Sequence, residues 1–402
     1  LPQPADRLHR LVDAQRGLGE QRLTRGLQQR LAADLQPWFE FSAFSAYRSE
    51  MMLQPLLEQL LPPGKVTPLT EFLAQADAAV AAFQPPAFGA DFPWEIEYDR
   101  AHHRVHLVAG ELETPQQEAF RAWLRGKRFV STVDVMLGGS TAQLEAGQGT
   151  VLLSEAHAGS EGLPTTIFFP DAHPAWSMVG YASEVFGPDA LILQPAEISK
   201  QSRGILTQLQ DLFLAVRNPS CPLVGSPDRQ IPIGQLMIHK QPGCDPIVSD
   251  GLRLYELVTA PWCFGATRLV SFSPQKLSTW MAQCIGSGGE VEGVQRLPAV
   301  VLGQLMLCRP MFCLSTSWLS ENFPSFSQQL DLPRYCYFRA DGKPQLLDCQ
   351  SQISLEVLRA EIGKSEQVVI SPMLPAAEDL WLQLSDGPYT SELRFLARWT
   401  AG

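Results

Sequence analysis

Residues 133–157, which read VDVMLGGSTAQLEAGQGTVLLSEAH, decide the fold class of this chain. Two short apolar runs, Val133–Leu137 and Val151–Leu153, lie on either side of a stretch rich in Gly and Gln. Short apolar runs bounded by turn residues are typical of β-strands. The segment therefore predicts two strands joined by a turn-rich connection.

Similar short apolar runs and amphipathic stretches occur on both sides of this segment. Further strands are predicted at 104–108, 166–169, 235–239, 253–258, 268–271, 334–338, 368–370 and 392–398. Helices are predicted at 115–124, 175–186, 199–216, 274–285 and 355–362. In residues 1–83, leucines recur at spacings of three and four, which is typical of amphipathic helices that Pro37 is expected to interrupt. The prediction is a mixed α+β fold, in which a helical N-terminal segment is followed by mixed sheets with flanking helices.

Proline-rich breaks divide the chain into three predicted parts. Pro62-Pro63-Gly64 separates two helices, and Pro85-Pro86 ends the helical region. We expect a helical subdomain over residues 1–85 and a mixed α/β subdomain that carries the candidate site over residues 86–225. A strand-rich α+β subdomain is expected over residues 226–402.

Composition excludes several classes of protein. The 402 residues are 45% hydrophobic and 18% charged, which argues against a disordered chain, a collagen or a coiled coil. No run of about 18 apolar residues is present, and the arginine-rich first 30 residues do not resemble a signal peptide. We therefore expect a cytoplasmic protein with no membrane partner. The chain begins with Leu1 rather than Met, which suggests a fragment of a longer protein.

Charge is distributed unevenly along the chain. A net charge of −11 argues against indiscriminate binding to nucleic acid. The stretch from Arg100 to Arg128 is nevertheless basic, with Arg121, Arg125 and Lys127 near its end. Such a stretch suits an anionic partner, and solvated helix faces are the alternative.

Cysteines and histidines predict no metal site. The eight cysteines form no CxxC pair, and none lies near a histidine at zinc-finger spacing. Most lie in apolar runs, so buried free thiols in a reducing cytosol are expected. His102, His103 and His106 lie close together in sequence, but without carboxylates at a definite spacing.

Two pairs of residues could carry chemistry. Glu155 and His157 follow the apolar run Val151–Leu153 at alternate positions, which share one face of a strand. They could act as an acid–base pair or steer an anion, and a structural hydrogen-bonded pair is the alternative. Lys200 and Arg203 lie three residues apart near the start of a predicted helix, so they share one helical face. They could grip a phosphate or a carboxylate, and ordinary surface charge is the alternative.

The order of motifs from Val133 to the end of the chain resembles the lantibiotic dehydratases, LanB-like enzymes that use aminoacyl-tRNA to modify ribosomally made peptides. The motifs are MLPAAEDLWL (373–382), GPYTSELR (387–394), LPRYCYF (332–338) with Leu347-Asp348, LSEAH (153–157) with DAHP (171–174), and IPIGQLMI (231–238). Arg203 falls where the family has an arginine on a helix. Pro372 departs from the pattern, because relatives usually carry Glu before MLP.

The resemblance implies transfer of an amino acid, such as glutamate, from tRNA to a Ser/Thr hydroxyl or a terminus of a precursor peptide. Peptide aminoacyl-tRNA ligases are equally compatible with it. On this resemblance Glu155, His157 and Arg203 are expected to be catalytic. The residues expected to bind tRNA or the aminoacyl group are Lys200, Arg203, Arg121, Arg125, Lys127 and Arg128. Aminoacyl-tRNA is the co-substrate, no bound cofactor is implied, and Arg334, Glu392 and Arg394 are expected to form structural ion pairs.

The resemblance covers only part of the family's glutamylation region, and no elimination domain is recognisable. A partner chain that supplies the N-terminal half would make this chain one half of a split enzyme that stops at the acylated peptide. The alternative is a non-catalytic scaffold subunit that binds a peptide or a partner enzyme in a complex that makes ribosomally synthesised, modified peptides. The missing half of the region favours this alternative.

Overall fold

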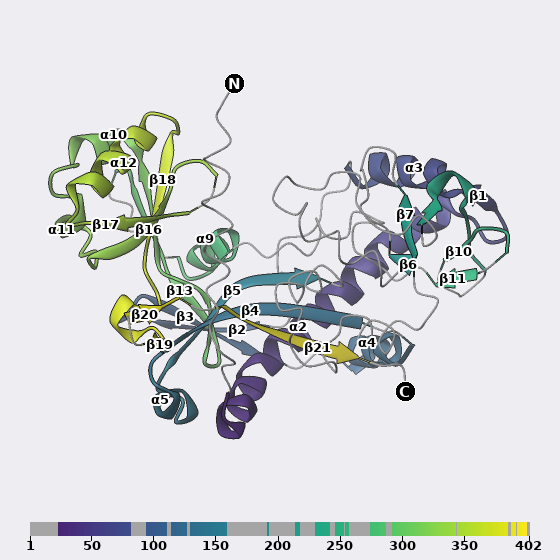
Figure 1. Cartoon of the computed structure of the whole chain (residues 1–402), viewed down its shortest axis with the longest axis horizontal. Helices are drawn as coiled ribbons and strands as arrows, with labels where there is room; N and C mark the ends of the chain where they lie inside the picture. The colour runs from purple at the N-terminus through teal and green to yellow at the C-terminus, as the bar shows by residue number, and fades with distance from the viewer. Residues whose placement is uncertain are drawn as a thin grey trace. The chain divides into compact units, whose positions relative to one another are not determined.

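The computed structural model shows a mixed α+β protein, as the sequence predicted (Figure 1). It describes residues 23–81, 94–110, 114–126, 129–158, 191–192, 214–217, 230–241, 246–252, 254–256, 274–286, 292–342, 344–384, 387–390 and 392–399. Two compact units share the chain. Unit 1 comprises Leu1–Gln29, Leu56–Ala78 and Ser160–Phe264, and unit 2 comprises Arg30–Pro55, Ala79–Gly159 and Gly265–Gly402. The three-part division at residues 85 and 225 stays a prediction.

The helix α2 (Arg25–Leu60) runs without a break through Pro37 and Pro55. The expected interruption at Pro37 is therefore wrong. Proline removes one backbone hydrogen bond of the helix, but burial of an apolar stripe offsets this loss. The fully or nearly fully buried members of the stripe are Leu27, Leu31, Leu35, Trp38, Phe41 and Phe44. At the N-terminus, the Thr24 hydroxyl caps the helix by accepting a hydrogen bond from the Leu27 amide at 3.2 Å.

Unit 1 contains a small antiparallel sheet, in the order β1-β9-β10-β11. Its strands are β1 (Val66–Pro68), β9 (Met237–His239), β10 (Ile247–Ser249) and β11 (Leu254–Glu256). The helix α3 (Leu69–Ala81) follows β1, and the Leu69 amide donates to the Leu236 carbonyl at 2.9 Å. A second, parallel sheet contains β6 (Leu191–Ile192), β7 (Leu214–Arg217) and β8 (Gln230–Pro232), followed by the 3₁₀ turn η5 (Ile233–Gln235).

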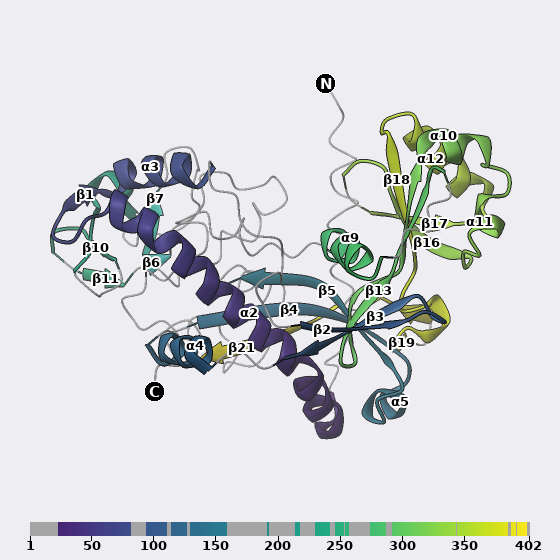
Figure 2. The same ribbon diagram turned by 180° about the vertical axis from the view of Figure 1, so that it is seen from behind.

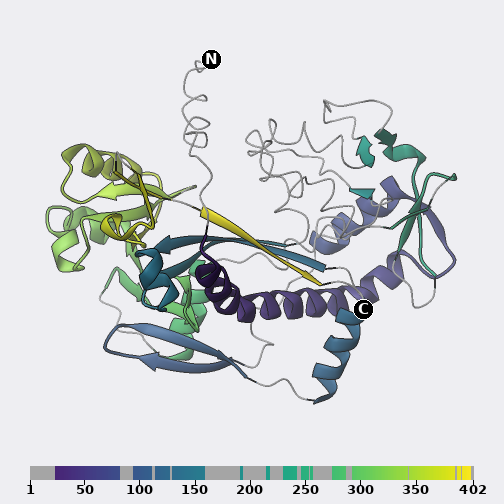
Figure 3. The same ribbon diagram turned by 60° about the horizontal axis from the view of Figure 1, so that its bottom comes forward.

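Unit 2 is built around a seven-stranded mixed sheet, in the order β2-β3-β13-β14-β5-β4-β21. The strands are β2 (Trp94–Asp99), β3 (Arg104–Ala109), β13 (Ala299–Leu302), β14 (Leu305–Cys308), β5 (Thr150–Ala158), β4 (Phe129–Gly138) and β21 (Glu392–Trp399). The pairs β3–β13 and β5–β14 are parallel, and the other pairs are antiparallel. The helix α2 lies along one face of this sheet (Figures 2 and 3).

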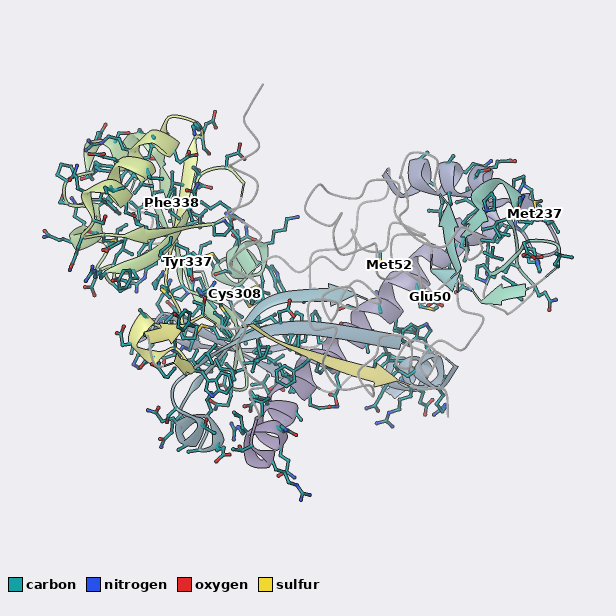
Figure 4. The ribbon with its side chains drawn as sticks, viewed as in Figure 1. Glu50, Met52, Met237, Cys308, Tyr337 and Phe338 are labelled. Carbon is teal, nitrogen blue, oxygen red and sulfur yellow. The ribbon has the colours of Figure 1, made fainter. Side chains whose placement is uncertain are left out.

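A second, five-stranded antiparallel sheet of unit 2 has the order β12-β15-β18-β16-β17. Its strands are β12 (Val294–Leu297), β15 (Met311–Ser315), β18 (Gln367–Pro372), β16 (Tyr335–Arg339) and β17 (Gln345–Asp348). The helices α10 (Thr316–Glu321), α11 (Phe326–Gln329) and α12 (Gln352–Ile362) supply buried side chains to the core on one face, around Phe338 (Figure 4). The helix α9 (Pro274–Cys284) packs on the other face through Ala282.

Smaller elements complete the described residues. These are α4 (Thr114–Gly126), α5 (Thr141–Glu145), η7 (Ala377–Asp379) and the hairpin of β19 (Leu382–Leu384) and β20 (Gly387–Tyr389). The strand expected at 166–169 and the helix expected at 175–186 lie outside the described residues. The helix expected at 199–216 is wrong at its end, because residues 214–216 belong to β7 and pair with strands on both sides. Among the described helices, none is long and apolar enough to cross a bilayer.

Candidate functional site

The candidate residues Glu155 and His157 lie inside β5, not after its end as the sequence suggested. β5 runs to Ala158, because its polar second half pairs with β4: Glu155 opposite Asp134 and His157 opposite Thr132. The register shifts between Asp134 and Val135, which leaves Ser154 as the extra residue of a β-bulge. Glu155 and His157 keep alternate positions of the strand, as predicted.

A row of three charged positions crosses the sheet at this bulge. Asp134 on β4 pairs with Glu155 of β5 on one side and with Arg394 of β21 on the other. We call Arg394, Asp134 and Glu155 the charged row. Directly opposite positions of antiparallel strands have Cβ atoms about 4.5–5.5 Å apart. Three chain segments that are distant in sequence therefore meet at one line across the sheet.

The charged row lies on the sheet face opposite α2. Ser131 is 1% exposed, and its hydroxyl is 2.9 Å from the hydroxyl of Ser42 on α2. Because side chains alternate along a strand, Asp134 belongs to the other face. Only 4% of Asp134 is exposed. A carboxylate this deeply buried carries a large desolvation cost unless charged or hydrogen-bonding groups surround it.

Sequence reasoning missed Asp134 as a site residue. A signal was available, since Asp134 is the one charged residue in the apolar run Val133–Leu137. Arg394 was noted only as a structural ion-pair residue, because nothing in the sequence states that β21 pairs with β4. The side chains of Glu155, His157 and Arg394 lie outside the described ones, so these residues are placed by register alone.

The helix α4 presents the basic residues Arg121 and Arg125 to solvent. Their i,i+4 spacing puts them on one helical face. The opposite face is anchored to α2: Phe120 packs edge-on against Phe44 at 5.5 Å between ring centroids. The Trp123 indole also donates a 3.0 Å hydrogen bond to Glu50, which Figure 4 labels on α2. This packing fixes which side of α4 carries the cations.

The remaining predicted cations cannot be placed. Lys127 and Arg128, between α4 and β4, lie outside the described residues, and so do Lys200 and Arg203. Their proposed roles stay predictions.

The MLPAAEDLWL motif has a structural explanation. Arg309 donates two hydrogen bonds to the Leu374 carbonyl, from Nε at 3.0 Å and from Nη2 at 2.8 Å. Pro375 lies against Gly138, where an added Cβ would come within 2.5 Å of the proline Cβ. The Trp381 amide donates to the Leu137 carbonyl at 3.2 Å. We call residues 373–382 with Arg309 and Gly138 the tail clasp, because they bind the end of β4.

The LPRYCYF motif also makes a structural contact. Arg334 forms an ion pair with Asp348 at 3.0 Å, with Nε and Nη2 both donating to the carboxylate. The hydrogen bonds from Arg334 lower the pKa of Asp348 below its ordinary 3.8. The guanidinium carbon also lies 4.8 Å from the centre of the Tyr335 ring. The ion pair expected for Arg334 is thus confirmed.

The histidines of the β2–β3 turn stabilise the turn. The His102 Nδ1 lies 2.7 Å from Asp99, and this hydrogen bond lowers the pKa of the Asp99 carboxyl. The His103 Nδ1 lies 2.8 Å from the Tyr98 hydroxyl, and burial lowers the pKa of His103. Within the described ranges, no group of three or more His, Cys, Asp or Glu side chains could hold a metal ion.

The five described cysteines are free thiols. Cys308 and Cys313 are buried, and burial raises the pKa of each. Cys336 is buried beside the half-buried Cys349, and the hydrogen bond between the two thiols raises the pKa of Cys336 and lowers that of Cys349. Cys284 is exposed, so the expectation of burial is wrong there, at the C-terminal end of α9.

No family model and no curated protein sequence matches the chain. Solved structures similar to it include the glutamylation domain TbtB from thiomuracin biosynthesis, at 15% identity and a TM-score of 0.45, over 94% of this chain and 50% of that one. The same domain bound to 5'-phosphodesmethylglutamycin is 14% identical with a TM-score of 0.43, over 89% and 47%. The tRNA-dependent lantibiotic dehydratase MibB from Microbispora sp. 107891 is 13% identical with a TM-score of 0.46, over 81% and 35%.

The chain therefore spans about half the length of the TbtB structures and about a third of MibB.

Proposed function

We propose that this chain takes part in aminoacyl-tRNA-dependent modification of a ribosomally synthesised precursor peptide, as an acyltransferase or as one half of a split one. The observation that supports it most is the position of Glu155 beside the buried Asp134, with His157 two residues further along β5. Acidic and imidazole groups on one face of a rigid sheet are suited to proton transfer. The reaction class is inferred from the sequence motifs that resemble those of the lantibiotic dehydratases.

In the proposed reaction, a hydroxyl or amine of the peptide attacks the acyl carbon of the aminoacyl ester. A bond forms between this nucleophile and the acyl carbon, and the bond from the acyl carbon to the ribose oxygen of the tRNA breaks. Glu155 or His157 accepts the proton of the nucleophile, and the proton then passes to the ribose oxygen. Because the ester is already activated, the protein mainly supplies positioning and electrostatic stabilisation.

Cationic side chains would bind the tRNA and the developing negative charge. We assign the tRNA backbone to the exposed Arg121 and Arg125 of α4, continued by Lys127 and Arg128. Lys200 and Arg203 would hold a phosphate or the aminoacyl group close to the reacting ester, where the planar guanidinium of arginine suits an oxyanion. No bound metal or organic cofactor is needed for this transfer.

Mass spectrometry of the peptide tests the proposal. The chain, with and without a candidate partner chain, is incubated with precursor peptide and charged tRNA. The expected result is a peptide heavier by one aminoacyl residue, in a reaction that requires the charged tRNA. Arg203→Ala should lower the transfer rate about 100-fold without changing the melting temperature, because one oxyanion-binding group is removed. Arg359→Ala, at an exposed position of α12, is the matched control.

A non-catalytic scaffold is the second candidate, and it is favoured by the MLPAAEDLWL motif, whose contacts with Arg309 and Gly138 stabilise the fold. A scaffold would bind peptide or partner while the peptide mass stays unchanged in every combination. Such an outcome, together with measurable peptide binding by calorimetry, would replace the acyltransferase proposal by the scaffold.

A further inference from the structure

The charged row brings Arg394 to the strand line that contains the candidate residue Glu155. Arg394 on β21 and Glu155 on β5 pair with the same residue of β4, Asp134. Their separation in the sequence hides this arrangement, and no motif spans it. The row lies at a β-bulge, a feature that is over-represented next to active sites because it redirects a strand.

The charges of the row favour a role of Arg394 in ligand binding. Two carboxylates at directly opposite positions repel each other, and Asp134 is almost completely buried. A buried charge is tolerated when an opposite charge and hydrogen bonds compensate it. Arg394 lies at the register position directly opposite Asp134, on the other side of β4 from Glu155. A guanidinium has five donors, so it can hold one carboxylate and still bind a second oxyanion.

The row lies in the part of the sheet that extends beyond β14. β14 pairs with β5 only at Val151 and Leu152, and the following half of β5 pairs with β4 alone in the part of the chain that the structure describes. The face away from α2 carries the row, whereas Ser131 on the other face is tied to Ser42. The row and the position of His157 therefore belong to the same face of the same three strands.

We propose that Arg394 binds an oxyanion of the acyl donor, either a phosphate of the aminoacyl-tRNA or the side-chain carboxylate of an acidic aminoacyl group, and that Asp134, at the directly opposite register position, is its positioning residue. This inference rests on the proposed function, which it deepens by assigning a donor-binding group on β21. Arg394 is then more than a structural ion-pair residue.

Two variants and a matched control test the assignment. Arg394→Gln should raise KM for charged tRNA about tenfold or more, and Asp134→Asn should raise the same KM less, with smaller changes in kcat for both. Arg398→Gln, four residues further along β21 and opposite Val130, should leave both constants unchanged. A structural role alone would instead lower the fraction of active protein and leave KM at its wild-type value.

Binding measurements separate this inference from the proposed function. Calorimetry with charged tRNA, uncharged tRNA and inorganic phosphate is performed on the wild type and on folded Arg394→Gln. One outcome is that the wild type transfers no amino acid to any peptide but binds an oxyanion, and that Arg394→Gln no longer binds it. The proposed function is then wrong, and the oxyanion-binding site is supported. Loss of binding only with tRNA charged with glutamate identifies the side-chain carboxylate of the glutamyl group, and loss with both charged and uncharged tRNA identifies a phosphate.

The assignment is overturned if folded Arg394→Gln keeps wild-type KM and wild-type binding of all three ligands. Arg394→Lys covers the case in which the glutamine variant does not fold, because lysine keeps the charge without the planar fork. Failure of both variants to fold would establish a structural ion pair and also overturn the assignment.

Discussion

The tail clasp and the charged row both hold distant parts of the chain against β4, but they differ in chemistry. The tail clasp works through backbone carbonyls, a proline ring and a glycine, and its one charged member outside the motif, Arg309, donates to a carbonyl. The charged row places three ionisable residues at one register line, with Asp134 buried. The MLPAAEDLWL motif is thus explained by packing, whereas the row combines Glu155 of LSEAH and Arg394 of GPYTSELR with Asp134, and no single motif contains all three.

This difference predicts opposite outcomes for mutations in the two regions. Changes in the charged row should lower transfer more than stability, and changes in the tail clasp should lower stability more than transfer.

Glu155→Gln should lower the transfer rate by about 100-fold or more while the free energy of unfolding changes little, because removal of a general base typically costs that much. Single-turnover transfer and urea unfolding measure the two quantities. Glu356→Gln, on the exposed surface of α12, serves as the control. Equal losses of stability and rate in Glu155→Gln would remove the distinction between the two regions.

Arg309→Ala should destabilise unit 2 by about 2–3 kcal/mol, because the variant cannot make the two charge-assisted hydrogen bonds to the Leu374 carbonyl. Urea unfolding measures the effect, and the folded fraction should keep its transfer rate. Arg359→Ala is the control, because it also removes an arginine, but one whose guanidinium lies 4.4 Å from the centre of the Phe323 ring and not in the tail clasp. A folded Arg309→Ala variant without activity would contradict the structural role of the clasp.

Gly138→Ala should destabilise the protein by about 1–3 kcal/mol, the usual cost of overpacking. The new methyl group would meet the Pro375 ring at 2.5 Å, and neither β4 nor the clasp can move away without disturbing the residues packed around it. Gly363→Ala is the matched control, because nothing lies within 4 Å of a Cβ added there. Similar melting temperatures for the two variants would show that the tail clasp accommodates the added methyl group without loss of stability.

The double variant Arg121→Gln with Arg125→Gln removes positive charge from α4, outside both regions. Stability should stay unchanged, because both side chains are exposed. The logarithm of the tRNA association constant should fall less steeply with the logarithm of salt concentration, by about 0.7–0.9 for each phosphate that the variant no longer binds. An unchanged slope in a salt titration would exclude α4 from the tRNA interface.

Asp348→Asn should have the smallest effect on stability, and this effect should appear only at a pH above the pKa of Asp348. The Asp348 pKa is lowered in the folded protein by Arg334, so its contribution is present above the ordinary value near 3.8 and is lost as pH falls through the lower, folded value. Melting temperatures of wild type and variant should differ slightly at about pH 5–8 and converge in stronger acid. Asp341→Asn, at an exposed position, is the control. A difference that persists at low pH would contradict the ion pair.

Periodicity and turn residues predicted local elements better than their partners. The apolar runs of β4 and β5 and the helical spacing of α12 could be read directly, because their own side chains encode them. The full length of β5 could not, since Glu155 and His157 pair with β4 although they are polar. The continuity of α2 through Pro37 depends on an apolar stripe that only the folded sheet can bury.

The sequence pointed to some of the candidate site residues and not to others, and their roles stay predictions. Glu155 and His157 stood out because an acid and an imidazole followed an apolar run, and Arg121 and Arg125 because basic residues gathered. Asp134 and Arg394 gained significance only through the register of three strands, which tertiary packing determines.

The pairing of β21 with β4 has a consequence for biosynthesis. Asp134 leaves the ribosome roughly 260 residues before Arg394, so during translation β4 is made long before the strand that pairs with it. An unfinished chain would carry an incomplete site and an uncovered edge of β4, which invites association with other strands. A chain that ends before Glu392 is therefore expected to aggregate more readily than the full chain, because β4 lacks its neighbour β21.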